Sequence, residues 1–384
     1  MTDKPIDLHI VLPLISGGSG GLVKGLVELV PRWKASPRVG EVVIHLPKAM
    51  LPEIDRLGVD VRRFPVNHMR PIMQRLAPTV VGSQARAIFA FTARPVRVPA
   101  LPLVTMVRNV EPIQKACYRM PPLWRLRLWA LRRDTLRACR EATRVVAVSH
   151  YVKERLLSYG VPSSKVDVVY HSAGPETEPA QRPHTCASIA GPFIFTAGSI
   201  VPYRGFEDLI RAVAILKARG GEIPTLVIAG SGGGLARPYE RWVRALPMVL
   251  GVGEHTVWAG QLARPEMTWC FRHAAAVVQT SRAESFSIFQ LEAMYAGASI
   301  ISCTQAPMPE ILGDAADYYV TGDPDDLARA LSQIMLARAD EVAARKAVAL
   351  SRASMFSWDR EAEQTLDSLE AAREDFARAR RERA

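Results

Sequence analysis

The alternation of short apolar segments with helix-like segments is the feature that most restricts how this chain can fold. An apolar run over residues 8–15 meets a glycine-rich segment over residues 16–21, and a helix-like segment follows at 22–30. Because parallel strands are buried and need helical crossovers, this order predicts an α/β fold with doubly wound parallel sheets. The other strands expected in the first half are 41–46, 103–107, 144–149 and 166–170, with a helix at 151–159.

A proline-rich segment divides the pattern into two similar halves. Residues 174–192 contain four prolines among polar residues, a composition that cannot hold a helix or a central strand. At 384 residues the chain also exceeds the size that one core usually serves. We expect an N-terminal domain at 1–185, completed by a C-terminal helix at 360–384, and a C-terminal domain at 190–359. The second half is expected to hold strands at 193–197, 225–229, 256–259, 276–280 and 299–302 and helices at 207–218, 265–273 and 288–296.

The charge balance is basic, with 49 Lys and Arg against 38 Asp and Glu, which favours an anionic partner. No uninterrupted apolar run approaches the roughly 20 residues that span a bilayer, and acids near the N-terminus do not fit a secretion signal. We therefore expect a cytoplasmic protein, soluble or peripherally attached to the inner face of the membrane. The scattered cysteines support neither a metal site nor a disulfide framework.

Two glycine clusters invite a dinucleotide-binding interpretation but do not complete its motif. The cluster at Gly18 has Val23 where the third glycine belongs, and the cluster at Gly230 has Leu235. A P-loop fails as well, because Leu26 follows its second glycine. Each turn can either let a ligand approach the backbone or merely pack, and the sequence leaves both alternatives open.

Two glutamates lie on either side of an expected helix start. Ser287 followed by Gln290 is a capping-box pattern, and Gly297 is a C-terminal stop. Glu284 then lies in the loop before the helix and Glu292 about one turn inside it. The N–H groups of this helix start suit a phosphate or a developing anion, while two solvated acids are the alternative.

Arg204 follows the first strand of the second half, within the segment 198–205. Ligands of doubly wound sheets bind at the carboxyl ends of the strands, so Arg204 is placed to meet a phosphate there. A lone surface arginine is the alternative.

Residues 119–140 contain seven arginines and one acid, with two tryptophans among them. Arginine beside tryptophan fits adsorption to an anionic membrane surface. Trp124, Leu128 and Leu131 share one helical face, but other apolar residues are spread around the axis, so the apolar stripe is not clean. A core helix with a basic solvent side is the equal alternative. Nucleic-acid binding is less favoured, since no binding module is recognised.

Together these residues resemble a known family. Glu284 and Glu292 form an E-x7-E pair within Glu-Ser-Phe-Ser and Leu-Glu-Ala-Met-Tyr-Ala-Gly, which is similar to the donor signature of retaining GT-B glycosyltransferases of family 4. The resemblance spans nearly the whole chain. Further matches lie at 16–21, 146–149, 168–171, 198–205, 257–260, 309–310 and 356–358.

The resemblance implies roles for individual residues. Glu284 would face the hydroxyls of the transferred sugar, Arg204 would neutralise the diphosphate leaving group without a metal, and Glu292 would hold the ribose. The remaining implied donor-site residues are Ser285, Phe286, Ser287 and Ile288 beside the sugar and diphosphate, Ser199 in the phosphate loop, Gly260, Gln261 and Leu262 beside the base, and the loop of Gly17, Gly18, Ser19, Gly20 and Gly21 near the diphosphate and acceptor.

Two departures from the family pattern stand out. Family members usually pair an arginine with a lysine in the loop that here runs from Ser199 to Arg204, so one positive charge is missing. They also commonly carry a histidine where this chain has Arg108, Asn109 and, nearby, Glu111. These side chains could contact the donor sugar or the acceptor, but none titrates as imidazole does.

The resemblance implies two Rossmann-like domains facing across a cleft, and a hexosyltransferase that uses a nucleotide sugar and no other cofactor. The acceptor would be a hydroxyl of a lipid-linked or lipopolysaccharide glycan of the cell surface. The alternatives are a GT-B phosphorylase or epimerase, a nicotinamide dehydrogenase, and a non-catalytic membrane-surface binding protein. The sugar, the base, the linkage and the oligomeric state stay open.

Overall fold

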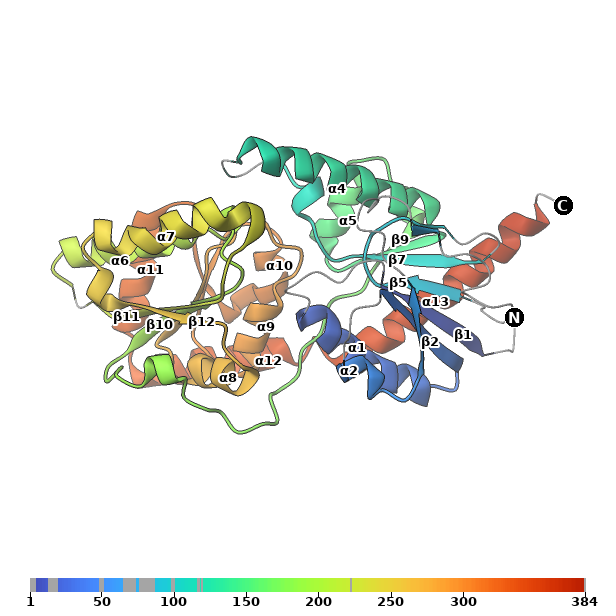
Figure 1. The fold of residues 1–384 in the computed structure, drawn as a ribbon. Helices are drawn as coiled ribbons and strands as arrows, with labels where there is room; N and C mark the ends of the chain where they lie inside the picture. The colour runs from blue at the N-terminus through green and yellow to red at the C-terminus, as the bar shows by residue number, and fades with distance from the viewer. Residues whose placement is uncertain are drawn as a thin grey trace. The chain divides into compact units, whose positions relative to one another are not determined.

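The computed structural model describes residues 5–12, 20–47, 52–64, 74–75, 87–97, 101–115, 118, 120–221 and 223–382. These residues form two compact units (Figure 1). The first unit comprises the described parts of Met1–Gln114, Leu126–Ser172 and Trp358–Ala384, and the second comprises Lys115–Arg125 and Ala173–Ser357. The chain therefore leaves the first unit after Ser172 and returns to it at Trp358.

The first unit is built on a parallel sheet whose described strands follow the order β3-β2-β1-β5-β7-β8-β9. Strand order reverses at β1, as doubly wound folds require. Side chains such as Leu8, Ile10, Phe89 and Val104 are fully buried, because helices cover both faces. The strands are β1 (Ile6–Val11), β2 (Val39–Pro47), β3 (Asp60–Phe64), β5 (Ala87–Ala90), β7 (Leu103–Val107), β8 (Arg144–Ala147) and β9 (Val166–Val168), beside a small pair of β4 (Gln74–Arg75) and β6 (Val96–Arg97).

Helices lie on both sides of this sheet, with α4 and α5 on one side and α1 and α13 on the other (Figure 1). The helix α13 comes from the far end of the chain. Trp33 Nε1 donates to the Ala362 carbonyl at 3.2 Å, and Arg144 pairs with Asp375 at 2.8 Å, so α13 is fixed to the first unit. The helices are α1 (Gly20–Ala35), α2 (Pro52–Asp55), α4 (Pro122–Glu141), α5 (His150–Leu157) and α13 (Trp358–Arg381).

The second unit repeats the architecture with the strand order β12-β11-β10-β13-β14-β15, again entirely parallel. Strand order reverses between β10 and β13. The strands are β10 (Phe193–Ala197), β11 (Thr225–Ala229), β12 (Thr256–Gly260), β13 (Ala276–Gln279), β14 (Ile300–Cys303) and β15 (Asp317–Tyr319). The helices are α6 (Phe206–Ala218), α7 (Arg237–Val249), α8 (Arg264–His273), α9 (Ile288–Tyr295), α10 (Met308–Leu312), α11 (Pro324–Met335) and α12 (Ala339–Ala353).

The prediction of two doubly wound parallel sheets is confirmed. The expected strands agree with the structure to within a few residues at their ends, and α1 begins at Gly20 inside the glycine segment. The sequence missed β3, β4, β5, β6 and β15. Each is five residues or shorter, too short for its pattern to stand out from the surrounding loops.

Candidate functional site

Gly198, Gly230 and Gly260 meet where β10, β11 and β12 of the second unit end. The Gly198 N–H donates to the Ala229 carbonyl at 3.1 Å, and the Gly230 N–H donates to the Gly260 carbonyl at 2.5 Å. A Cβ on Gly230 would lie 2.0 Å from the Gly198 carbonyl oxygen, and the φ of Gly230 is +113°. Only glycine therefore fits at position 230, where the ends of two strands pack closely. This agrees with the alternative in which the glycine turn serves packing.

Arg204 and Glu284 lie together at this edge. Arg204 ends a short 3₁₀ helix (Pro202–Arg204), and its Nη1 donates to Glu284 Oε1 and, at 3.2 Å, to Ser281 Oγ. A Cβ on Gly198 would lie 3.4 Å from Arg204 Nε, so the guanidinium packs over that glycine. The fold thus joins the two residues to which the resemblance gives catalytic roles.

Gln279, at the end of β13, fixes the carboxylate of Glu284. Its Nε2 lies 2.8 Å from Glu284 Oε1, 3.1 Å from Ser281 Oγ and 3.3 Å from Ser287 Oγ. Glu284 Oε1 therefore receives hydrogen bonds from both a charged and a neutral donor. Such a carboxylate is oriented before any ligand arrives.

Arg282 ties the loop that carries Glu284 to the start of α6. Its guanidinium donates to Glu207 at 2.8 Å and to Asp208 at 2.5 Å, and its N–H donates to the Tyr203 carbonyl at 2.7 Å. Burial raises the pKa of Asp208 to about 6, although the Arg282 charge opposes this shift. The two acids also lie in the first turn of α6, where the helix dipole favours negative charge.

The capping box expected at α9 is wrong. No side chain caps this helix; Ser287 has a φ of +77° and its Oγ accepts from Gln279. Gln290 is buried and accepts from Ser302 Oγ at 3.2 Å. Both side chains are held by the sheet, so neither can serve the helix start. A left-handed serine is strained, and strain of this kind concentrates at functional sites.

The other predicted donor-site residues lie around this cluster on the same unit. Ser199 is exposed directly after Gly198, and Gln261 Nε2 donates to Ser231 Oγ at 3.2 Å beside Gly260. Glu292 lies half-buried one turn into α9. Phe286 is buried, and Leu262, Ser285 and Ile288 are half-buried. Gly17, Gly18 and Ser19 lie outside the described residues.

The first-unit candidates lie after β7. Arg108 Nη2 donates to the Gly21 carbonyl at 3.1 Å, and its guanidinium carbon lies 4.8 Å from the centre of the Phe91 ring. Burial lowers the pKa of Arg108 to about 10, and the charge of Glu361 partly offsets this. The Asn109 side-chain oxygen accepts from the Glu111 N–H at 3.0 Å, which fixes the turn between them.

His171 is buried, with Nδ1 3.0 Å from Glu361 of α13. Burial lowers its pKa, so the ring is neutral at neutral pH. His150 is exposed at the start of α5, and His68 lies outside the described residues.

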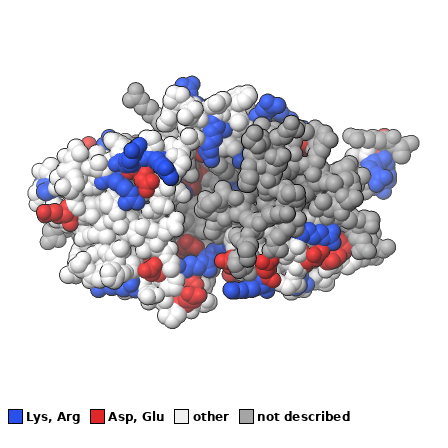
Figure 2. Space-filling model, viewed as in Figure 1, with Lys and Arg blue, Asp and Glu red and all other residues white. Residues whose placement is uncertain are grey.

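In the basic helix α4, the face shared by Trp124 and Leu128 is buried, which agrees with the core-helix alternative, and other apolar side chains of the helix are exposed. Trp124 and Leu128 are buried, whereas Leu123, Leu126 and Trp129 are 65%, 62% and 58% exposed. Arginine side chains lie between these exposed apolar residues in the sequence of α4. Figure 2 shows Lys and Arg side chains at several places along α4. Arg119, also part of the basic segment, lies outside the described residues.

Among the residues that the structure describes, no group of three or more His, Cys, Asp or Glu side chains is arranged to hold a metal ion. Within the same residues, no helix is both long enough and apolar enough to span a bilayer.

Two family models match the chain in succession. The model described as Glycosyltransferase Family 4 matches residues 26–176, and the one described as Glycosyl transferases group 1 matches residues 188–349. The chain belongs to glycosyltransferase family 4. Most of each unit lies within one of the two matches.

Curated relatives include D-inositol 3-phosphate glycosyltransferases. The Streptomyces griseus protein is 32% identical over 193 residues, which cover 48% of this chain and 40% of the relative. The Nocardia farcinica protein is 29% identical over 251 residues, covering 62% and 55%. The chain thus spans about half the length of the curated relatives it matches.

Solved structures agree over nearly the whole chain. HepE from Anabaena, solved in complex with UDP-glucose, superposes with a TM-score of 0.74 at 18% identity, covering 95% of this chain and 99% of that one. The lipopolysaccharide outer core galactosyltransferase WaaB gives a TM-score of 0.66 at 15% identity, with coverage of 95% and 99%. At such identities the likeness concerns the fold, which is the GT-B fold.

Proposed function

We propose that this chain is a retaining glycosyltransferase that moves a sugar from a nucleotide diphosphate sugar to a hydroxyl acceptor. The observation that carries the proposal is the contact between Arg204 and Glu284, which Gln279 and Ser281 hold at the carboxyl edge of the second sheet. Ligands of doubly wound folds bind at this edge. The family membership and the UDP-glucose bound in the HepE structure support a nucleotide-sugar donor.

In this proposal Arg204 acts on the leaving group. The bond between the sugar carbon and the diphosphate oxygen breaks as the acceptor hydroxyl oxygen forms a bond to the same carbon. Negative charge grows on the diphosphate, which accepts the proton of the acceptor hydroxyl as it leaves. A guanidinium fixed beside that oxygen stabilises the growing charge more strongly than it stabilises the intact donor, which lowers the barrier. Arg204 would supply this charge without a metal ion.

Glu284 would face the hydroxyls of the transferred sugar. Its Oε1 is held by Arg204 and Gln279, so its position is fixed when the donor arrives. A carboxylate in this place also stabilises the positive charge that develops on the sugar carbon. Glu292, one turn into α9, would hold the ribose hydroxyls.

We further propose that the acceptor is linked to a lipid and that α4 brings the protein to an anionic leaflet at the inner face of the membrane. Leu123, Leu126 and Trp129 would enter the interface, and neighbouring arginines would pair with lipid headgroups. Each basic residue near such a surface contributes about 1 kcal/mol.

A thermal-shift screen of UDP-, GDP-, dTDP- and ADP-sugars tests the donor site. One nucleotide class should stabilise the wild type, and Arg204→Ala and Glu292→Ala should each reduce the shift. Arg272→Ala and Glu254→Ala alter exposed charges of the same unit and should leave the shift unchanged. No stabilisation of the wild type, or unchanged binding by the first two variants, would refute the donor-site assignment.

A further inference from the structure

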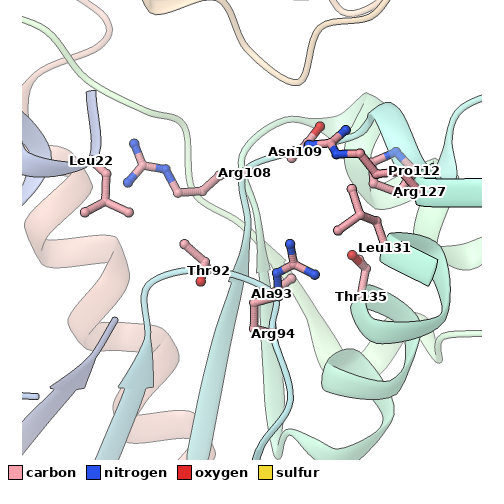
Figure 3. A pocket seen from close by; sticks show the side chains of 10 residues that line it. All are labelled: Leu22, Thr92, Ala93, Arg94, Arg108, Asn109, Pro112, Arg127, Leu131 and Thr135. Carbon is pink, nitrogen blue, oxygen red and sulfur yellow. The ribbon is translucent and has the colours of Figure 1, made fainter. Parts of the chain in front are cut away.

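The first unit contains a cavity of about 240 Å³ between the ends of β5 and β7 and the helices α1 and α4. In Figure 3, Arg108 extends toward Leu22 of α1, whereas Arg94 extends toward Leu131 and Thr135 of α4. The lining residues are Leu22, Thr92, Ala93, Arg94, Arg108, Asn109, Pro112, Arg127, Leu131 and Thr135.

Three of these lining residues are arginines, and none is acidic. The carboxylates that accompany the arginines lie behind the wall. Asp134 Oδ2 is 3.2 Å from Arg94 Nη1, and Glu111 Oε2 is 3.9 Å from Arg127 Nη1. The cavity therefore presents positive charge to whatever enters it.

The pKa shifts of Arg94 and its partner Asp134 also indicate surplus positive charge in the cavity. Burial lowers the pKa of Arg94 in spite of the attraction of Asp134, and burial raises the pKa of Asp134 itself. The acid thus offsets only part of the cost of burying the guanidinium. An anion in the cavity would supply the remainder.

We propose that this cavity, called here the arginine pocket, binds a phosphate group of the acceptor through Arg94, Arg127 and the hydroxyl of Thr135. The proposal rests on the glycosyltransferase function and specifies its substrate class. Guanidinium groups donate in a fixed fork that matches phosphate oxygens, and a hydroxyl completes the set. In Figure 3, Arg94 and Thr135 turn toward the same space, with Asn109 and Arg127 on its other side.

The size of the arginine pocket limits what it can hold. Pockets for whole drug-sized ligands are about 300–1,000 Å³, so a cavity near 240 Å³ suits a phosphate or diphosphate with a small adjoining group. The rest of the acceptor would lie outside it. Both a free sugar phosphate and a lipid-linked phosphate carry this chemistry.

Calorimetry with inorganic pyrophosphate tests the proposal. Titrations are run at constant ionic strength with the donor site saturated by the nucleoside diphosphate that stabilises the wild type. The wild type should show saturable binding, and Arg94→Gln and Arg127→Gln should each weaken it about tenfold or more. Arg133 lies on α4, as Arg127 does, but its side chain is exposed and does not line the pocket. The Arg133→Gln variant should therefore bind pyrophosphate as the wild type does.

The Arg127 side chain is 45% exposed, against 26% for Arg94, so the Arg127→Gln variant should fold even if Arg94→Gln does not. Absence of saturable binding by the wild type, or wild-type affinity in Arg127→Gln, would overturn the proposal. Both variants should keep wild-type affinity for the nucleoside diphosphate, which separates failure of the arginine pocket from failure of the donor site. Glucose 1-phosphate and farnesyl phosphate in detergent then identify the source, and binding by neither would also count against the proposal.

Discussion

The two units share one architecture but arrange their charged groups in different ways. In the second unit, Arg204 is paired with Glu284, and Arg282 is paired with Glu207 and Asp208. In the first unit, the arginine pocket is lined by arginines whose carboxylates lie behind the wall. In the first arrangement each arginine has a carboxylate beside it within the site, whereas the second is completed by an anion from outside.

The same sheet topology can therefore serve two tasks. An internally paired site holds its side chains in fixed positions, as differential stabilisation of a transition state demands. A pocket with surplus positive charge gives affinity for an anionic group without requiring that any bond break. We therefore associate chemistry with the paired groups in the second unit and substrate positioning with the pocket in the first.

Loss of Arg282 should lower the free energy of unfolding more than any other change predicted below. Arg282→Ala leaves Glu207 and Asp208 as buried acids without that partner, which typically costs 3–5 kcal/mol of unfolding free energy. Urea unfolding measures this loss of free energy. Arg219→Ala, which removes an exposed pair with Asp325, should cost about 0–1 kcal/mol. Equal effects of the two variants would show that the Arg282 pairs contribute no special stability.

Gly230→Ala should disturb the strand ends beside Arg204. The added Cβ meets the Gly198 carbonyl at 2.0 Å and the backbone is left-handed, so we expect a loss of about 3 kcal/mol. Gly233→Ala is the matched control in the same turn, because a Cβ there meets nothing within 4 Å. Thermal unfolding compares the stability of the two variants. A Gly230→Ala variant as stable as the wild type would contradict the packing role of Gly230.

Acidification should weaken the first unit selectively. His9 Nδ1 and His45 Nε2 lie 2.9 Å apart, and burial lowers the pKa of each from 6.5 to about 4. The unfolded chain binds more protons in this range, so the stability present above pH 6.5 is lost toward pH 4, by about 3 kcal/mol for each histidine. Asp208 acts in the opposite sense, because its pKa is raised to about 6 in the folded state.

Hydrogen exchange at pH 7 and pH 5, corrected for intrinsic rates, should show reduced protection of β1 and β2. The strands β10 and β13 should lose less. Equal losses in both units would contradict this assignment, as would an unchanged pH dependence in a His45→Gln variant.

The smallest predicted effect is on membrane binding by the exposed apolar residues of α4. Leu126→Gln and Trp129→Gln should each weaken sedimentation with phosphatidylglycerol-containing vesicles by about 1–2 kcal/mol, because each removes apolar surface from the interface. Leu336→Gln changes a residue of the second unit that is 80% exposed and should have no effect. If all three variants bind vesicles alike, α4 is not the membrane contact.

Sequence reasoning recovered the strand and helix order because buried parallel strands and amphipathic crossovers leave regular patterns. It also selected Glu284 and Arg204, which lie in strand-end loops. It missed Gln279 and Arg282, although a polar residue ending the run Ala-Val-Val-Gln was a usable signal. Their roles depend on partners about 75 residues away or across a loop, which no local pattern contains.

The capping box failed, whereas α4 agrees with the core-helix alternative, and both outcomes have the same physical cause. The capping box at Ser287 and the apolar face of Trp124 and Leu128 were both read from spacing along one helix. Tertiary packing decided both, since the sheet engages the Ser287 side chain and the core takes the two apolar ones. Spacing shows which side chains share a face but not which face becomes buried.

The assignment of chemistry to Arg204 and Glu284 is tested most directly by an enzymatic assay. The assay measures how fast the wild type and Glu284→Gln release the nucleoside diphosphate from the nucleotide sugar that stabilises the protein. We expect the variant to fold and to bind the nucleoside diphosphate with near wild-type affinity. Its release rate should fall about 100-fold or more. Release by the variant at the wild-type rate, or no release by the wild type above the buffer rate, would contradict the assignment of chemistry to the Arg204 and Glu284 network.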